Sequence, residues 1–294
     1  MDKYNEAIAK FDTAIEDGQV RYNVEKILGE HYAENCTGEV YRFILSCLDL
    51  TSLETTDNDA TITAFISKVN EFENTYPEIN PVAAVCVYPN FVTTVRGMLD
   101  VSSVKIASVA GGFPSAQTYS ELKTVEAGLA LHDGADEIDM VMNVGNFLGG
   151  NYQEMCDEIS EMKETCHDAK LKVILETGLL PSTSEVMKAS VLALYSGADF
   201  IKTSTGKTGT GATPEAVYAM ALAVREYSRL NGVRVGIKVA GGVRTASEAV
   251  KYYTIIKEVL GQEWLTPDLF RIGASSLADS LLSEITGKET RFFG

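Results

Sequence analysis

The chain has 294 residues, 45% of them hydrophobic, and a formal net charge of −16. This composition excludes a disordered chain and is that of a folded protein with a sizeable core. The acidic balance argues against nucleic acid as the main partner, because a phosphate backbone needs clustered Lys and Arg. A small anionic ligand would need local positive charge or free backbone N–H groups at its site.

The cysteines and histidines argue against disulfides and against a metal site. The five cysteines are scattered and form no CxxC pair, which is typical of reduced thiols in the cytosol. The three histidines, His31, His132 and His167, lack HxxxH or HxH spacing, so we expect no metal. No apolar run is long enough to span a membrane and the N-terminus lacks a signal-peptide pattern, so we expect a cytoplasmic protein.

In chain order, residues 1–30 predict an amphipathic helix, since Ile8, Phe11 and Ile15 recur at helical spacing. We assign residues 1–40 to a helical extension that packs on a catalytic domain of residues 41–294.

From about residue 40 onward, short β-rich runs alternate with helical patterns such as Thr118–His132, Tyr152–His167 and Pro214–Leu230. The predicted strands are Arg42–Leu48, Val82–Tyr88, Val104–Val109, Glu137–Met142, Leu171–Glu176, Phe200–Thr203, Val233–Val239 and Leu269–Ile272. Eight such alternations predict an α/β fold, a (β/α)8 TIM barrel. A doubly wound open sheet is the alternative, but it would favour GxGxxG after the first strand, and the segment Asp49–Leu53 has no glycine.

Two lysines are predicted to face the barrel interior. If Ile201 faces the helices, the alternation of a strand turns Lys202 inward, and the same argument turns Lys238 inward on the next strand. Neighbouring strands lie about 4.8 Å apart, and like charges at such range lower a lysine pKa and free a neutral, nucleophilic amine. The alternative for Lys202 is a structural ion pair or a phosphate contact.

Two carboxylates accompany them. Asp139 points inward if Ile138 and Met140 pack on the helices, and it could balance charge or relay protons. Its alternative is a salt bridge alone. Asp49, at the end of the first predicted strand, is expected to support a lysine.

The loops after strands seven and eight predict a phosphate site. They read Gly241-Gly242-Val243-Arg244 and Gly273-Ala274-Ser275-Ser276, and Lys207 follows strand six. Glycine pairs and serine helix starts are common singly, but barrels often bind phosphate with these two loops and a helix N-terminus.

Six strings together resemble the deoxyribose-phosphate aldolase family: LDLT at 48–51, VCVYP at 85–89, EIDMV at 137–141, FIKTSTGK at 200–207, GIKVAGGVR at 236–244 and RIGASS at 271–276. The resemblance implies reversible cleavage of 2-deoxy-D-ribose 5-phosphate to glyceraldehyde 3-phosphate and acetaldehyde, with no cofactor. It implies Lys202 as the Schiff-base lysine, Lys238 as the second catalytic lysine and Asp139 as the proton-handling aspartate. We also expect a homo-oligomer.

The resemblance also implies supporting and phosphate-binding residues. The supporting residues are Asp49, Thr51, Thr203 and Cys86, of which Cys86 could equally be a core thiol. The phosphate-binding residues are Gly206, Lys207, Gly241, Gly242, Arg244, Gly273, Ser275 and Ser276.

The chain departs from the family pattern at two places, and two alternative functions stay open. Val239-Ala240 stands where some relatives have Pro-Ala, and residues 290–294 contain no tyrosine of the kind that moves protons in some relatives, so Asp139, Lys238 and water are expected to suffice. One rival is a barrel lyase or transaldolase acting on another sugar phosphate. The other is a phosphate-ligand binding protein without catalysis, which would have no use for two adjacent inward lysines.

Overall fold

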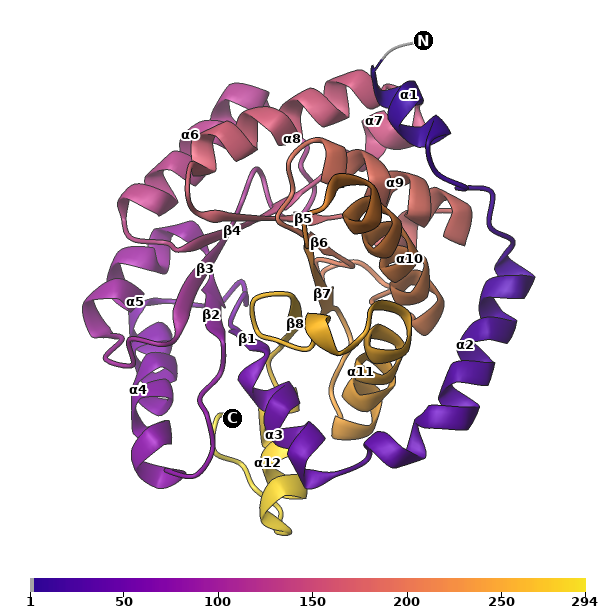
Figure 1. Cartoon of the computed structure of the whole chain (residues 1–294). Helices are drawn as coiled ribbons and strands as arrows, with labels where there is room; N and C mark the ends of the chain where they lie inside the picture. Colours follow the sequence, from indigo (N-terminus) through magenta and orange to yellow (C-terminus); the bar gives the residue numbers. More distant parts are fainter. Residues whose placement is uncertain (1–2) are drawn as a thin grey trace.

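The computed structural model describes residues 3–294, and its centre is a closed barrel of eight parallel strands in the order β1 to β8 (Figure 1). The strands are β1 (Leu48–Thr51), β2 (Ala84–Val87), β3 (Lys105–Ala110), β4 (Glu137–Val141), β5 (Lys170–Ile174), β6 (Phe200–Lys202), β7 (Gly236–Ala240) and β8 (Phe270–Ala274). Because β1 also pairs with β8, the sheet has no free edge, and the TIM barrel is confirmed over the doubly wound sheet.

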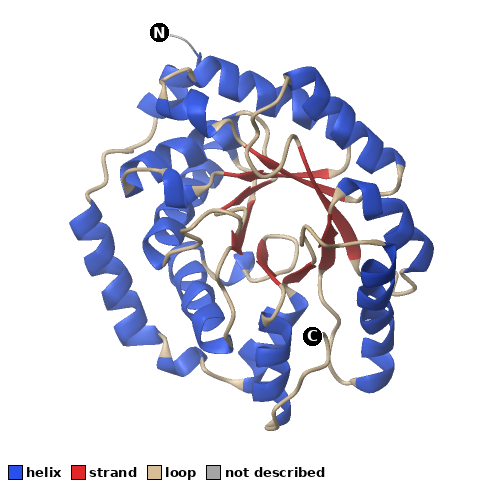
Figure 2. Cartoon of the chain, turned by 180° about the vertical axis from the view of Figure 1, so that it is seen from behind, coloured by secondary structure: helices blue, strands red, loops and turns tan. Residues whose placement is uncertain are grey.

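Helices form the outer layer around the strands (Figure 2). They are α1 (Lys3–Ala9), α2 (Asp17–His31), α3 (Gly38–Ser46), α4 (Asp59–Thr75), α5 (Val92–Met98), α6 (Ser120–His132), α7 (Val144–Leu148), α8 (Tyr152–Cys166), α9 (Thr183–Tyr195), α10 (Pro214–Asn231), α11 (Ala246–Leu260) and α12 (Leu277–Thr286). Four short 3-10 helices add η1 (Ala33–Asn35), η2 (Pro89–Phe91), η3 (Thr177–Leu179) and η4 (Gln262–Trp264). Side-chain caps fix where several helices begin, as at Thr213 before α10 and Thr245 before α11. Among residues 3–294, no helix is both long and apolar enough to cross a bilayer.

The alternation of side chains along the strands determines what fills the barrel. Ile201 and Ile237 face the helices and belong to the main core. Their neighbours therefore point into the barrel, where Phe200 lies against Gly236: a Cβ on that glycine would come within 2.2 Å of the Phe200 ring. The barrel interior is thus packed with side chains and has room for polar groups only where strand residues supply them.

The first predicted strand was wrong. Residues 42–46 belong to helix α3, and strand β1 begins six residues later than predicted, at Leu48. The Thr37 side chain caps the helix, and Val40 and Ile44 lie four residues apart on its buried face. A short apolar run with β-branched residues cannot be assigned to helix or strand by periodicity alone. As a consequence, Asp49 lies within β1.

The N-terminal extension is two helices, where the sequence predicted one. Helix α1 ends at Ala9, and α2 begins at Asp17. Between them Phe11 is buried edge-on against Tyr195 of α9, so the chain leaves the helical path to reach this contact. Helix α2 then runs along the outside of α10 and α11 (Figure 1). Residue 40, the predicted boundary, falls inside α3.

Candidate active site

Lys202 and Lys238 lie side by side inside the barrel, on the neighbouring strands β6 and β7, where they are Cα partners in the parallel register. Their Nζ atoms donate to the same oxygen, Oδ2 of Asp139 on β4, at 2.7 Å each. Lys238 and Asp139 are fully buried, and 3% of Lys202 is exposed. The structure therefore brings together the three residues that the sequence predicted to act together.

Four further buried charges extend this group into a closed network. Lys172 on β5 donates to Oδ1 of Asp139 at 2.8 Å and contacts Glu137 at 2.5 Å. Arg271 on β8 lies 2.9 Å from Glu137 and 2.6 Å from Asp49. Asp49 closes the ring by contacting the lysine of β7. The sequence prediction included Asp49 but missed the other three.

The charges of the network sum to zero when Lys202 is a neutral amine. It contains three carboxylates and, besides Lys202, three cations: Asp49, Glu137 and Asp139 against Lys172, Lys238 and Arg271. A fourth cation in this buried space would have no counter-charge of its own. Lys202 is therefore the member of the network best suited to be a neutral, nucleophilic amine.

The pKa shifts agree with this balance. Burial lowers the pKa of Lys202, the Asp139 carboxylate partly offsets that effect, and the charge of Lys238 lowers it further. The neighbouring lysine thus acts in the direction predicted from the sequence, but burial is the larger cause. Burial also disfavours the charge on Lys238, yet Asp139 and Asp49 outweigh it and raise the pKa of Lys238.

The carboxylate between the lysines is held ionised. Burial alone would raise the pKa of Asp139, but Lys172, Lys202 and Lys238 together hold it well below its usual range. In the resting site Asp139 is consequently an ionised acceptor that orients the ammonium and amine groups.

A cavity of about 240 Å³ gives access to Lys202. It is lined by all eight residues predicted to surround a phosphate: Gly206, Lys207, Gly241, Gly242, Arg244, Gly273, Ser275 and Ser276. These residues lie on the loops after β6, β7 and β8, and α12 begins directly after the two serines. Thr205 and Glu54 also line the cavity and were missed. One cavity therefore combines the Lys202 amine with two cationic side chains and glycine-rich backbone.

The predicted supporting residues have different surroundings. Thr51 lines the cavity and donates to the Asp49 carbonyl at 2.8 Å. Thr203 joins β6 to β7, because its hydroxyl donates to the Ala240 carbonyl at 2.8 Å and accepts from the Ala240 N–H at 2.9 Å. Cys86 is fully buried, and burial raises its pKa, so it is a neutral thiol beside the network.

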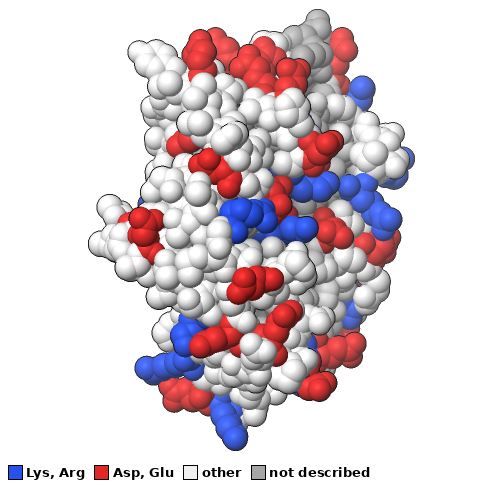
Figure 3. Space-filling view, turned by 90° about the vertical axis from the view of Figure 1, so that its left-hand side faces the viewer, with Lys and Arg blue, Asp and Glu red and all other residues white. Residues whose placement is uncertain are grey.

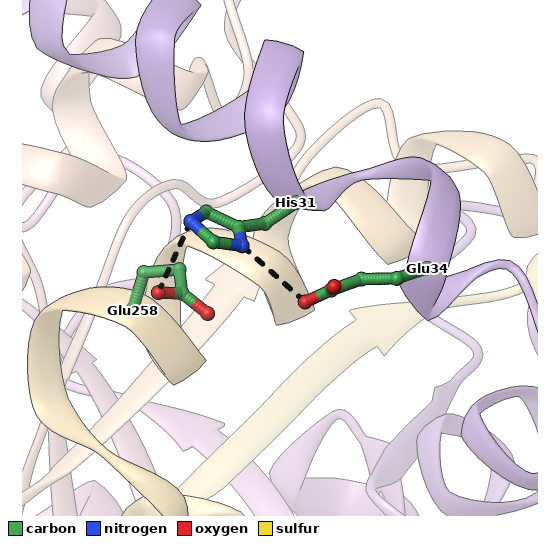
Figure 4. A group of neighbouring side chains, drawn as sticks. All are labelled: His31, Glu34 and Glu258. Carbon is green, nitrogen blue, oxygen red and sulfur yellow. Dashed lines mark hydrogen bonds and ion pairs between the residues drawn. The ribbon is translucent and has the colours of Figure 1, made fainter.

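A histidine and two glutamates meet on the outside of the barrel. His31 of α2 lies 3.3 Å from Glu34 of η1 and 3.7 Å from Glu258 of α11 (Figure 4). Within residues 3–294 this is the one group of three such side chains with ligand atoms near enough to share a metal. Its members are partly or largely exposed, and Lys257 already contacts Glu34 at 3.5 Å. The cluster joins the N-terminal extension to the barrel and has no part in the lysine site.

Comparison with known proteins finds relatives of this chain in both sequence and fold. Residues 44–278 match the family described as DeoC/LacD family aldolase. The chain is 40% identical over 251 residues to deoxyribose-phosphate aldolase of Bos taurus, covering 82% of this chain and 79% of that protein. It is 46% identical over 205 residues to the mouse protein of the same name, covering 69% and 64% of the two chains. A solved structure of deoxyribose phosphate aldolase from Aeropyrum pernix, described as tetrameric, superimposes with a TM-score of 0.66 at 25% identity, over 87% of this chain and 96% of that one. The chain belongs to the DeoC/LacD family of aldolases.

Proposed function

We propose that the chain cleaves 2-deoxy-D-ribose 5-phosphate reversibly to D-glyceraldehyde 3-phosphate and acetaldehyde, through a Schiff base on Lys202. The bovine and mouse relatives bear the name of this activity. The observation that carries the proposal is the pair of lysines bound to one oxygen of Asp139, with only Lys202 reaching the cavity.

The chemistry follows from a neutral amine beside a cation. The Lys202 amine adds to the C1 carbonyl of the open-chain sugar, and loss of water gives an iminium that withdraws electrons from the C2–C3 bond. The C3 hydroxyl loses its proton as this bond breaks, which releases glyceraldehyde 3-phosphate and leaves an enamine. Protonation at C2 and hydrolysis then release acetaldehyde and restore the amine.

Proton transfer in this scheme belongs to Lys238 and Asp139. Lys238 has the raised pKa and the buried ammonium, so it is the group that carries a proton beside the amine. Asp139 holds both Nζ atoms and relays the proton between them and water. The loops after β6, β7 and β8 bind the phosphate through backbone N–H groups and the side chains of Lys207 and Arg244.

The test is release of glyceraldehyde 3-phosphate from deoxyribose 5-phosphate, combined with acetaldehyde and borohydride trapping. Peptide mapping should find the ethyl adduct on Lys202. Lys202→Met should abolish both signals, whereas Lys207→Met should keep the adduct, since acetaldehyde has no phosphate. An adduct chiefly on Lys238 would refute the assignment. Trapping without release would favour a lyase for another sugar phosphate, and neither signal would favour a binding protein.

We also propose that copies of the chain associate through helix α6. Tyr119, Leu122, Val125 and Leu129 form a stripe on and just before this helix, and each is more than half exposed. The side of the molecule that carries α4 to α6 in Figure 1 has broad areas without charged side chains (Figure 3). Antiparallel packing of two such stripes would bring Glu121 of each copy toward His132 of the other. Exposed apolar stripes of this kind are typical of interfaces.

Light scattering after size exclusion tests the association. The double variant Leu122→Glu, Leu129→Glu should lower the mass to that of a single chain, and Leu230→Glu, an exposed leucine on α10, should not. A monomeric wild type, or an unchanged mass in the double variant, would contradict the proposal. For the cell, we propose a cytoplasmic location, which fractionation would test. In residues 3–294 the cysteines form no disulfide bond, as is usual in the reducing cytosol.

A further inference from the structure

A buried carboxylate lies outside the lysine network, at the end of β5. Glu176 is 1% exposed. Among residues 3–294 no Lys, Arg or His side chain forms an ion pair with it. Its backbone has φ 51° and ψ 56°, in the left-handed region that residues with a Cβ seldom adopt. Such backbone is retained where the surrounding structure requires it, and this is frequent at functional sites.

The partners of this carboxylate all belong to one residue of the β6–α10 loop. The Thr205 N–H donates to Oε1 of Glu176 at 3.2 Å, and the Thr205 hydroxyl donates to Oε2 at 2.5 Å. The same hydroxyl oxygen accepts the backbone N–H of Lys207 at 3.0 Å. A continuous chain of hydrogen bonds thus runs from Glu176 through Thr205 to the backbone of Lys207.

This chain of bonds ends in the wall of the cavity. Thr205, Gly206 and Lys207 are consecutive lining residues, so the carboxylate holds the turn that presents them. Close backbone contacts leave the rest of the loop little freedom: a Cβ on Gly211 would lie 2.1 Å from the Gly241 carbonyl oxygen. The Ala212 N–H also donates to that carbonyl at 3.0 Å.

The chemistry of the donors explains why an acid stands here. An O–H and an N–H converge on the side chain, and a carboxylate accepts from both. A glutamine would turn its NH2 group toward one of these donors and lose that bond. Electrostatics alone would give the opposite preference, because a buried negative charge beside an anion site repels the anion.

We infer that Glu176 is a positioning residue for the phosphate end of the substrate, which acts through Thr205 to fix Gly206 and Lys207 in the cavity wall. The inference rests on the proposed function for the identity of the phosphate ester. It assigns no contact between Glu176 and the substrate itself. It also predicts the direction in which the affinity for the anion changes. Removing the negative charge of Glu176 should weaken anion binding, whereas simple charge repulsion predicts tighter binding.

The experiment compares Glu176→Gln, Thr205→Val and Thr205→Ser with wild type. Glu176→Gln and Thr205→Val should raise KM for deoxyribose 5-phosphate about ten- to a hundredfold, as expected for a lost hydrogen bond to a charged group. They should change kcat and the rate of acetaldehyde trapping on Lys202 only about twofold, because neither depends on the phosphate. Thr205→Ser keeps the hydroxyl and should retain the wild-type KM.

Asp199→Asn is the matched control, since this carboxylate lies at the opposite end of β6 and accepts the Leu171 N–H at 2.8 Å. It should lower the melting temperature and leave KM unchanged. Calorimetric titration with inorganic phosphate gives a readout without turnover, and its dissociation constant should rise in Glu176→Gln and Thr205→Val.

An unchanged or tighter phosphate constant in both variants would overturn the inference, as would an equal rise of KM in Asp199→Asn. The wild type could also fail to cleave deoxyribose 5-phosphate while the variants bind inorganic phosphate more weakly than it does. That result would uphold the positioning role and refute the proposed substrate.

Discussion

Replacing Lys238 by methionine tests whether the charge balance of the network determines the protonation state of Lys202. In the wild type, three cations offset three carboxylates and leave Lys202 without a counter-charge of its own. Without Lys238 the carboxylates outnumber the remaining two cations, and a proton on Lys202 restores the balance. We therefore expect the ammonium form of Lys202, paired with Asp139, to predominate near neutral pH.

The magnitude follows from the geometry. The two Nζ atoms contact one oxygen at 2.7 Å each. Two unit charges roughly 4 Å apart interact by about 4 kcal/mol at an effective dielectric constant of about 20. Removing this repulsion should raise the pKa of Lys202. Because about 1.4 kcal/mol is a tenfold change in an equilibrium, the fraction of reactive amine near neutral pH should fall by about two to three orders of magnitude.

The assay is kcat/KM for deoxyribose 5-phosphate as a function of pH. The acid limb should move to higher pH in Lys238→Met, and borohydride trapping of acetaldehyde should show the same displacement. The double variant Lys238→Met, Asp49→Asn removes one charge of each sign, so its acid limb should return toward that of the wild type. Identical acid limbs in the single and double variants, with both proteins folded, would refute the charge-balance argument.

Four further predictions follow from the structure. Ser276→Asp should raise KM for deoxyribose 5-phosphate far more than it alters cleavage of unphosphorylated deoxyribose, by about two to three orders of magnitude for a partly desolvated like-charge contact; equal losses on both sugars would separate this loop from the phosphate. The pKa values of Asp139 and Asp49 are lowered by folding, so their stabilisation is present above the usual carboxyl pKa of about 4 and lost as pH falls below it; urea unfolding from pH 7 to pH 3 should show this loss. Gly236→Ala should destabilise the fold by about 1–3 kcal/mol through overpacking against Phe200, whereas Gly18→Ala, which has open space, should not lower the melting temperature. Activity should survive EDTA, because the iminium supplies the electron sink, and a loss restored by a divalent ion would contradict this mechanism.

The sequence was most informative where the alternation of side chains along one strand is enough to predict which of them face the barrel interior. Lys202, Lys238 and Asp139 were predicted to face inward because neighbours on the same strand are apolar, and the structure has them in one cluster. Lys172 and Arg271 obey the same alternation in β5 and β8. Their role was missed because their partners come from strands distant in the chain, and only closure of the barrel brings Arg271 to Asp49.

Other features depend on tertiary contacts that no local pattern contains. Residues 42–46 form a helix because burial of Val40 and Ile44 on one helix face outweighs the β-propensity of the run. The bond between Glu176 and Thr205 joins two loops whose approach depends on the pairing of β5 with β6. The string around Glu176 gives no sign of a carboxylate partner, since the partner is a threonine and not a cation.

A barrel interior of charged groups is a poor device for stability alone. Buried ion networks cost desolvation, and apolar residues of similar volume often stabilise a core equally well or better. Ile174 and Phe200 are apolar residues of the same strands, so the fold accommodates such side chains in β5 and β6. The network is better explained by what it does to Lys202. If the neighbouring cation Lys238 alone lowered the pKa of Lys202, losing that cation would raise this pKa, and no second substitution in the network would lower it again. If the balance sets it, removing one carboxylate together with the cation restores the neutral amine. The double variant Lys238→Met, Asp49→Asn separates these two accounts, and the closed ring of contacts from Asp139 through Lys172, Glu137 and Arg271 to Asp49 favours the second.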